Sequence, residues 1–253
     1  MIKFFRKIRQ NLLMQNKTGK YFKYAIGEIV LVVIGILIAL QINNWNSHRI
    51  NTNRNHVLLK KLSKELDLNI DRSSILDIGG KYVGLEERYI YADSVSKLLD
   101  KNKVSNNLDY VIREYIFFVI HFNINTAVYE ELKNTGSLYS LASDNLVTEI
   151  QRYYQLCERE SFYNLEYSKD VITLRDKCFD GWYDFVYWHK KNPEEAFKRH
   201  PWINNPTSNE YIEFRQFIEA VRWHSELISN KLKGIIQESE ELKKLISSEL
   251  NVL

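Results

Sequence analysis

The apolar positions of this chain form one continuous stretch near the N-terminus and several periodic stretches after it. The continuous stretch runs from Tyr24 to Trp45, and residues 29–40 within it are apolar, interrupted only by Gly35. A bilayer core is crossed by about 20 residues, and backbone groups in lipid must pair within their own segment. The pattern therefore predicts a transmembrane α-helix, which we place at residues 21–45.

Aromatic residues stand at both ends of this span, as is typical of membrane–water interfaces. We expect Tyr21 and Tyr24 to be interfacial anchors at one end and Trp45 at the other. A cleaved signal peptide is the alternative. It is disfavoured because the preceding basic region is long, Glu28 interrupts the approach, and residues 37–39 are a poor cleavage site.

Beyond the span, apolar residues recur at alternating intervals of three and four, which is the spacing of one face of an α-helix. The same spacing carries the membrane helix on to about residue 76, until the Gly79-Gly80 pair stops it. Further helices are predicted at residues 82–99, 108–122 and 126–135, with a polar linker at residues 100–107 and Gly136 as a C-terminal cap.

Two longer stretches keep this spacing without a slip and predict long helices. One covers residues 144–190, as a single helix or two collinear ones, with Glu160 and Asn164 as polar interruptions. The other runs from a T-x-x-E capping box at Thr207–Glu210 to about residue 246. A helix of about 40 residues is about 60 Å long, so it must pack against the first long helix or a neighbouring subunit.

The distribution of proline supports an all-α fold. The three prolines are Pro193, Pro201 and Pro206, so nothing forbids continuous helix before the first of them. Asn192 and Pro193 together predict the start of a short helix that ends by His200.

We expect three parts along the chain. Residues 1–20 form a cytoplasmic amphipathic segment, residues 21–45 the transmembrane helix, and residues 46–253 a periplasmic helical bundle with long coiled-coil-like helices. The first part has apolar residues on one helical face and cations on the other, as in a helix that lies in the membrane interface. A flexible basic tail is the alternative.

Positive charge is concentrated before the membrane span. Residues 1–24 carry seven cations and no acid, so the net charge of +3 for the whole chain leaves −4 for the remainder. This cationic excess predicts a cytoplasmic N-terminus that contacts an anionic lipid surface. The slightly acidic remainder argues against nucleic-acid binding, which needs a cationic footprint.

Small residues and one acid distinguish the membrane helix. Gly35 and Ala39 form a small-x-x-x-small pair, with Gly27 two turns earlier, and such faces let helices pack closely in lipid. Glu28 is an acid inside a spanning helix, which is costly and commonly functional. Because Glu28 is shallow, three roles stay open: contact with headgroups or a partner's cation, an inter-helix contact, and an ion or proton relay.

The two cysteines, Cys157 and Cys178, lie on the apolar face of the first long helix. Twenty-one residues along one helix span about 31 Å, which is far beyond the reach of a disulfide bridge. We therefore expect buried free thiols, unless a turn separates the two residues.

Aromatic side chains cluster after these cysteines. Trp182, Trp188, Trp202 and Trp223 are a candidate aromatic pocket, and a core where helices meet is the alternative.

Motifs that carry catalysis or bind cofactors are missing from the sequence. The six histidines show no H-x-x-x-H or H-E-x-x-H spacing, and the chain has no C-x-x-C, G-x-S-x-G or glycine-rich phosphate loop. We predict no catalytic, metal or cofactor site and a non-enzymatic protein. A site assembled from residues distant in sequence is the alternative.

Three segments carry a family resemblance: KIRQNLL, YFKYAIGEIVLVVIGILIALQINNWN and VYEELKNTGSLYSLASDNLVTEIQRYY. They resemble an uncharacterised membrane-anchored family that is widespread in Bacteroidota and known as a domain of unknown function. The resemblance implies a single N-terminal anchor and a helical extracytoplasmic domain, and it brings no activity and no catalytic residues.

These features predict a scaffold or accessory protein of the bacterial inner membrane. It would bind a partner protein, or a second copy of itself, through the membrane helix and the faces of the long helices. An extracytoplasmic ligand-sensing bundle is one alternative. An accessory subunit of a membrane enzyme or conduit that uses Glu28 is the other.

Overall fold

The computed structural model describes residues 14, 18–113, 119–178 and 181–252. These residues form α-helices and short 3-10 turns without a β-strand, which confirms the all-α class. The chain divides into two compact units, Met1–His56 and Val57–Leu253.

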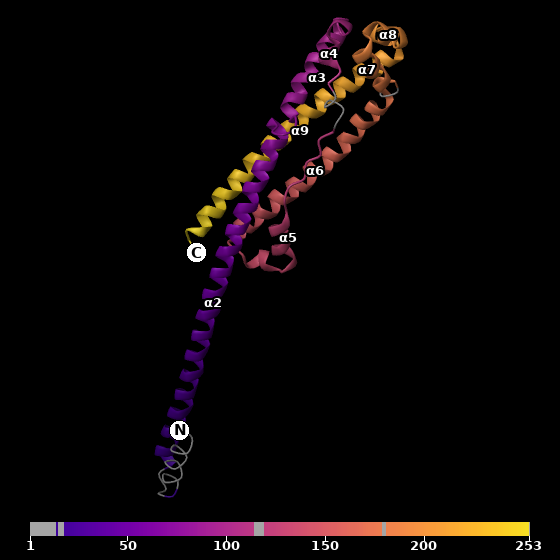
Figure 1. The fold of residues 1–253 in the computed structure, drawn as a ribbon. Coiled ribbons are helices and arrows are strands. Elements are labelled where there is room, and N and C mark those ends of the chain that lie inside the picture. The colour runs from indigo at the N-terminus through magenta and orange to yellow at the C-terminus, as the bar shows by residue number, and fades with distance from the viewer. Residues whose placement is uncertain (1–13, 15–17, 114–118, 179–180, 253) are drawn as a thin grey trace. The chain divides into compact units, whose positions relative to one another are not determined.

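Helix α2 (Thr18–Ile78) starts in the first unit and ends in the second (Figure 1). From Ala25 onward it contains an 18-residue window with a mean hydropathy of 2.6, and none of that window is buried. Leu31 and Leu37 in this part are 61% and 55% exposed. A helix that is apolar on all its faces matches a lipid environment, and this one is long enough to cross a membrane.

The aromatic anchors expected at the ends of the span are described only in part. Trp45 is exposed on α2, with the guanidinium carbon of Arg49 5.5 Å from the centre of its ring. Tyr21 and Tyr24 also lie in α2, but their side chains are outside the described part of the chain. Nearly all of the expected amphipathic segment at residues 1–20 is outside it as well.

The C-terminal end of α2 falls where the glycine pair predicts. Gly79 has a positive φ of +105° and forms an isolated β-bridge with Val83. A Cβ added at Gly84 would come within 2.4 Å of the backbone oxygen of Asp77. Glycine therefore permits both the unusual backbone and the close approach. The chain re-enters helix at once in α3 (Leu85–Asp100).

The two longest helices that lie wholly within the second unit are α6 (Asp144–Cys178) and α9 (Asn209–Leu250). They pack along each other in antiparallel directions (Figure 1). Glu249, at the end of α9, accepts hydrogen bonds from the amide and hydroxyl of Ser143, just before α6, at 2.8 and 2.9 Å. Near the other ends of both helices, Ser168 of α6 meets His224 of α9. The predicted packing of the last helix against the first long one is confirmed.

Helix α9 also packs antiparallel to α2 and α3 within this unit. Lys243 near the end of α9 pairs with Asp67 of α2. At the start of α9, the Tyr211 hydroxyl donates to the carbonyl of Leu99 in α3 at 2.8 Å. Helix α9 is therefore the common partner of the long helices of the second unit.

Shorter elements complete this unit. They are η1 (Ser105–Asn107), α4 (Leu108–Val111), α5 (Ala127–Asn134), η3 (Ser137–Ser140), α7 (Trp182–Lys191), α8 (Pro193–Arg199) and η4 (Pro201–Asn204). Two of their boundaries follow predicted signals. The Asn192 side chain accepts hydrogen bonds from the amides of Glu194 and Glu195 at the start of α8, and Gly136 after α5 has a φ of +67°.

The first long helix is divided in two. Its spacing allowed a single helix to about residue 190, but α6 ends at Cys178 and α7 begins at Trp182. Gly181 between them has a φ of +85°, which interrupts helical backbone geometry.

The helix predicted at residues 108–122 is wrong for the described residues after α4, which are 112–113 and 119–122. Helix α4 ends at Val111, and the described residues 119–126, which we call the connecting segment, are not helical. Their backbone groups bond to side chains of other helices, as shown below for the candidate site, and this replaces the hydrogen bonds of a helix.

The cap of α9 lies one residue later than predicted. The hydroxyl of Ser208, not that of Thr207, accepts a hydrogen bond from the Tyr211 amide at 3.2 Å. The Thr207 hydroxyl instead donates to the side chain of Asn205 at 2.8 Å.

Two hydrophobic clusters fill the second unit, and a polar layer separates them. One cluster joins α3, α7 and the first half of α9, and the other joins α2, α5 and the second half of α9. Along α6, the second cluster ends at Cys157 and the first begins at Val171, with buried Asn164 and Ser168 between them. His224 of α9 is buried in the same layer.

Candidate functional site

A row of buried polar side chains follows one face of α2 inside the second unit. Glu65, Asn69, Ser73 and Asp77 recur every four residues, and each is at most 2% exposed. A polar side chain that is removed from water needs a hydrogen-bond partner. Glu65 and Asn69 find theirs in the stretch of chain at residues 125–154.

Asn69 pairs with the backbone of Asn125 in both directions. Its side-chain amide donates to the Asn125 carbonyl at 3.0 Å, and its side-chain oxygen accepts from the Asn125 amide at 2.7 Å. One turn further on, the Arg72 guanidinium donates to the backbone carbonyl of Asn123 at 2.7 Å and to its side-chain oxygen at 2.5 Å. Side chains of α2 thus satisfy the backbone of the connecting segment.

Helix α6 contributes further hydrogen bonds to the same segment. The Asn164 side chain accepts from the Phe122 amide at 3.4 Å and donates to the Ile120 carbonyl at 3.4 Å. The Ser161 hydroxyl donates to the Phe122 carbonyl at 3.2 Å. Two helices therefore hold the connecting segment largely through hydrogen bonds to its main chain.

Glu65 caps the N-terminal end of α5. Its carboxylate accepts from the amides of Val128 at 2.6 Å and Tyr129 at 3.3 Å, which are amides without a partner inside that helix. The Tyr154 hydroxyl of α6 donates to the same carboxylate at 2.5 Å. Burial and this hydrogen bond raise the pKa of Tyr154, so its hydroxyl remains a donor to Glu65.

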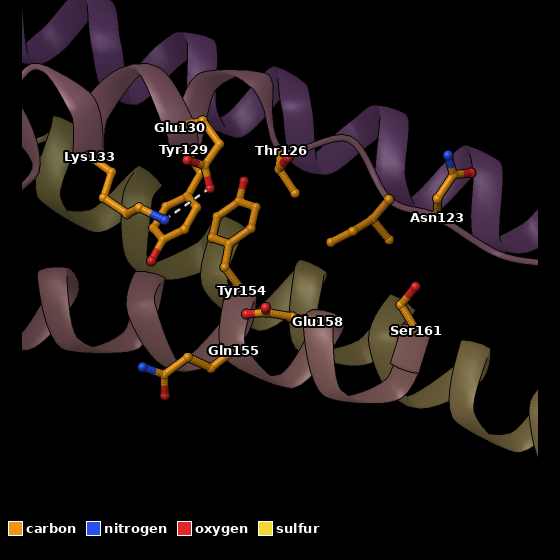
Figure 2. Close-up of a pocket in the computed structure, with 10 residues that line it drawn as sticks. Asn123, Thr126, Tyr129, Glu130, Lys133, Tyr154, Gln155, Glu158 and Ser161 are labelled. Carbon is orange, nitrogen blue, oxygen red and sulfur yellow. Dashed lines mark hydrogen bonds and ion pairs between the residues drawn. The ribbon is translucent and has the colours of Figure 1, made fainter. Parts of the chain in front are cut away.

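An open cleft lies between α5 and α6, next to this network (Figure 2). Its volume of about 360 Å³ falls within the range of small-molecule sites, roughly 300–1,000 Å³. Tyr129 of α5 and Tyr154 of α6 stack in it, with ring centres 4.0 Å apart and planes at 6°. The cleft is also lined by Asn123, Ile124, Thr126, Glu130, Lys133, Gln155, Glu158 and Ser161.

Charge in the cleft is unbalanced. The Lys133 ammonium lies 3.1 Å from a carboxylate oxygen of Glu130 and 5.4 Å from the centre of the Tyr129 ring (Figure 2). The hydrogen bond and charge of Glu130 raise the pKa of Lys133, and the charge of Glu158, which also lines the cleft, adds to this effect. The described lining residues therefore carry two acids and one cation.

His224 is the buried histidine of the polar layer. It is 2% exposed, and its Nε2 lies 3.3 Å from the Ser168 hydroxyl. That hydroxyl donates to the Asn164 carbonyl at 2.7 Å, so its oxygen accepts from the imidazole N–H. Burial, aided by the charges of Arg88 and His121, lowers the pKa of His224 to about 4, and the ring is neutral at neutral pH.

The candidate residues of the membrane helix lie on α2 in the first unit. Gly27, Gly35 and Ala39 are exposed, and a Cβ added at either glycine would meet nothing within 4 Å. Glu28 is partly exposed. Within the chain, the small-residue face is therefore uncovered.

Both cysteines are buried and free in the structure, as their positions on one helix predict. Burial raises the pKa of Cys157 and of Cys178 to about 12. Neither side chain is a reactive thiolate.

The four tryptophans proposed as an aromatic pocket are divided between the core and the surface. Trp182 and Trp202 pack on Phe214 in the first hydrophobic cluster, with ring centres 5.1 and 5.8 Å from it. Trp188 is partly buried against that cluster, and Trp223 is 50% exposed on α9. The core alternative therefore holds for Trp182 and Trp202.

Sequence reasoning missed the polar row and the cleft, although it noted two polar residues on the apolar face of α6. Asn164, described above as a polar interruption, holds the connecting segment. Glu160, the other interruption, pairs with Lys231 of α9. Burial acts to raise the pKa of Glu160, but hydrogen bonds from Lys231 and Arg159 lower it overall. A polar residue at a position where the helical spacing expects an apolar one could have indicated these contacts. Glu65 and Asn69 are residues of this kind as well.

Comparison with known proteins finds no relative: no family model, curated protein or solved structure matches the chain. Among the residues that the structure describes, no group of three or more His, Cys, Asp or Glu could hold a metal ion. Over the residues that the structure describes, the fold and site define a class: an all-α protein that combines one candidate membrane helix with a helical unit containing an open cleft.

Proposed function

We propose that the protein is a non-enzymatic recognition protein of the bacterial inner membrane. Its N-terminus would lie in the cytoplasm, and the helical unit from Val57 onward would lie in the periplasm and bind a partner protein or a second copy. The observation that supports this most directly is the unburied apolar part of α2, because water would not tolerate such a surface and lipid would. The cationic residues before the span support the orientation.

Alkaline extraction of membranes tests the anchor. We expect the full chain to stay in the membrane pellet after a carbonate wash, with an intact mass that retains Met1. Replacing Ile36 and Leu37 together with lysine should release most of the protein, because each lysine costs about 3 kcal/mol at a helix centre. Ile90→Lys, at an exposed position of α3, is the control and should stay membrane-bound. Release of the unaltered chain, or loss of its first 40 or so residues, would contradict the proposal.

Self-association through the membrane helix is a separate prediction. Gly35→Leu places a bulky side chain on the small-residue face and should reduce the detergent-corrected mass of the protein towards that of one chain. Gly234→Leu, at an exposed position of α9, is the matched control. The measurement is multi-angle light scattering in a mild detergent. An unchanged mass for Gly35→Leu would rule out this face as the interface.

A second candidate function is ligand sensing by the helical unit, and the cleft between α5 and α6 favours it. The cleft has the volume of a small-molecule site, and both of its walls are tied to the network around Glu65. A ligand there would contact α5 and α6 together, and so would bias how these two helices pack.

A further inference from the structure

We propose that the cleft between α5 and α6 binds a small organic cation, specifically a primary amine attached to an aromatic or aliphatic body. This inference rests on the ligand-sensing candidate above and names the chemistry of its ligand. Three features of the cleft support it: its aromatic wall, its excess of carboxylates over cations, and a hydroxyl that can accept from a ligand.

The aromatic wall is rigid. Tyr154 is 4% exposed and stacks on Tyr129 with nearly parallel rings, 4.0 Å between centres. The hydroxyl of Tyr154 is fixed by Glu65, which also fixes the first turn of α5. A wall fixed in advance can bind a flat or aliphatic body without first paying the entropy of ordering its own side chains.

The charges of the cleft favour a cationic ligand. The cleft already binds one ammonium group, that of Lys133. This group pairs with the Glu130 carboxylate and lies over the Tyr129 ring. Glu158 projects its carboxylate toward the cleft beside Tyr154, and it shares the one lysine of the described lining with Glu130 (Figure 2). A ligand with one positive charge would complete the second pair.

Two hydroxyls beside the cleft have no proton to offer a ligand. The Ser161 hydroxyl has its proton committed to the Phe122 carbonyl, and the Tyr154 hydroxyl has its proton committed to Glu65. The oxygen of Ser161, which lines the cleft, keeps lone pairs that can accept from a ligand. An ammonium group supplies three donors and no acceptor, so it can donate to these lone pairs and to the Glu158 carboxylate together.

Isothermal titration of the full chain in a mild detergent tests the proposal with three probes that share one body. Tyramine carries an ammonium group, tyrosol a hydroxyl in its place, and 4-hydroxyphenylacetate a carboxylate. We expect tyramine to bind at least tenfold more tightly than either analogue. Equal affinities, a preference for the carboxylate, or no saturable binding of tyramine would overturn the assignment.

Two variants locate the binding. Glu158→Gln should weaken tyramine binding at least fivefold, while Asp170→Asn, an exposed acid on the same helix, should leave it unchanged. Lys133→Met removes the competing internal cation and should strengthen tyramine binding severalfold, an increase that a merely structural role of Lys133 would not produce. Unchanged binding in both Glu158→Gln and Lys133→Met would overturn the site. Membrane extraction of the same variants reports separately on the anchor, so failure of one proposal is distinguishable from failure of the other.

Discussion

Replacing Glu65 with alanine is expected to lower the free energy of unfolding by about 3 kcal/mol or more. The substitution removes the acceptor for three donors at once: the amides of Val128 and Tyr129 and the hydroxyl of Tyr154. The hydroxyl is buried with Tyr154, and an unsatisfied buried donor costs roughly 1–3 kcal/mol. The loss combines an unsatisfied network, a missing helix cap and a small cavity.

Urea unfolding of the full chain in a mild detergent, followed by circular dichroism, measures this loss. Asp71→Ala is the matched control, because Asp71 is an exposed acid on the same helix and should change stability by less than about 0.5 kcal/mol. Glu65→Gln should fall between the two, since its carbonyl still accepts a backbone amide. If Glu65→Ala behaved like Asp71→Ala, the capping role assigned to this carboxylate would be wrong.

Stability is expected to fall between pH 8 and pH 5, with His224 contributing about 2 kcal/mol of the decrease. The ring has a pKa of about 4 in the folded chain, against 6.5 for an unperturbed histidine. Between these values the unfolded chain binds a proton that the folded chain does not. The free energy of unfolding therefore falls as the pH drops through 6.5, and the contribution levels off below about pH 4.

The variant His224→Gln isolates this contribution. A glutamine amide can still donate to the Ser168 hydroxyl but does not titrate, so the variant should lose stability less steeply between pH 8 and pH 5. His48→Gln, at an exposed position of α2, should keep the slope of the unaltered chain. Equal slopes for His224→Gln and the unaltered chain would show that the histidine charges without penalty.

The helices could be predicted because the residues that determine each helix lie close together in the sequence. The 4–3 spacing of apolar residues located α3, α6 and α9, and glycines located the ends of α2 and α5. The sequence left open one helix or two collinear ones at residues 144–190, and it did not place the break because the apolar spacing continues across Gly181. A single glycine is compatible with a continuous helix, so only the packed structure distinguishes the two outcomes.

The connecting segment and the cleft could not be predicted because the residues that form them lie far apart in the sequence. Leu108, Val111 and Phe122 share a helical spacing, but Phe122 lies in a segment whose backbone is bound by Asn164. The matching residue on α2, Asn69, lies 56 positions before its partner. A pattern within one stretch of sequence does not encode such a pairing, and tertiary contacts override local propensity there.

The way the connecting segment is held has a consequence for how the chain acquires its native state. Its main-chain partners lie 42 positions later, on α6, and 56 positions earlier, on α2. Closing loops of this length is entropically unfavourable until both helices have met, and long-range contacts slow folding. The ordering of residues 119–126 therefore depends on contact between two helices that are remote in sequence. We expect this segment to become ordered late in folding.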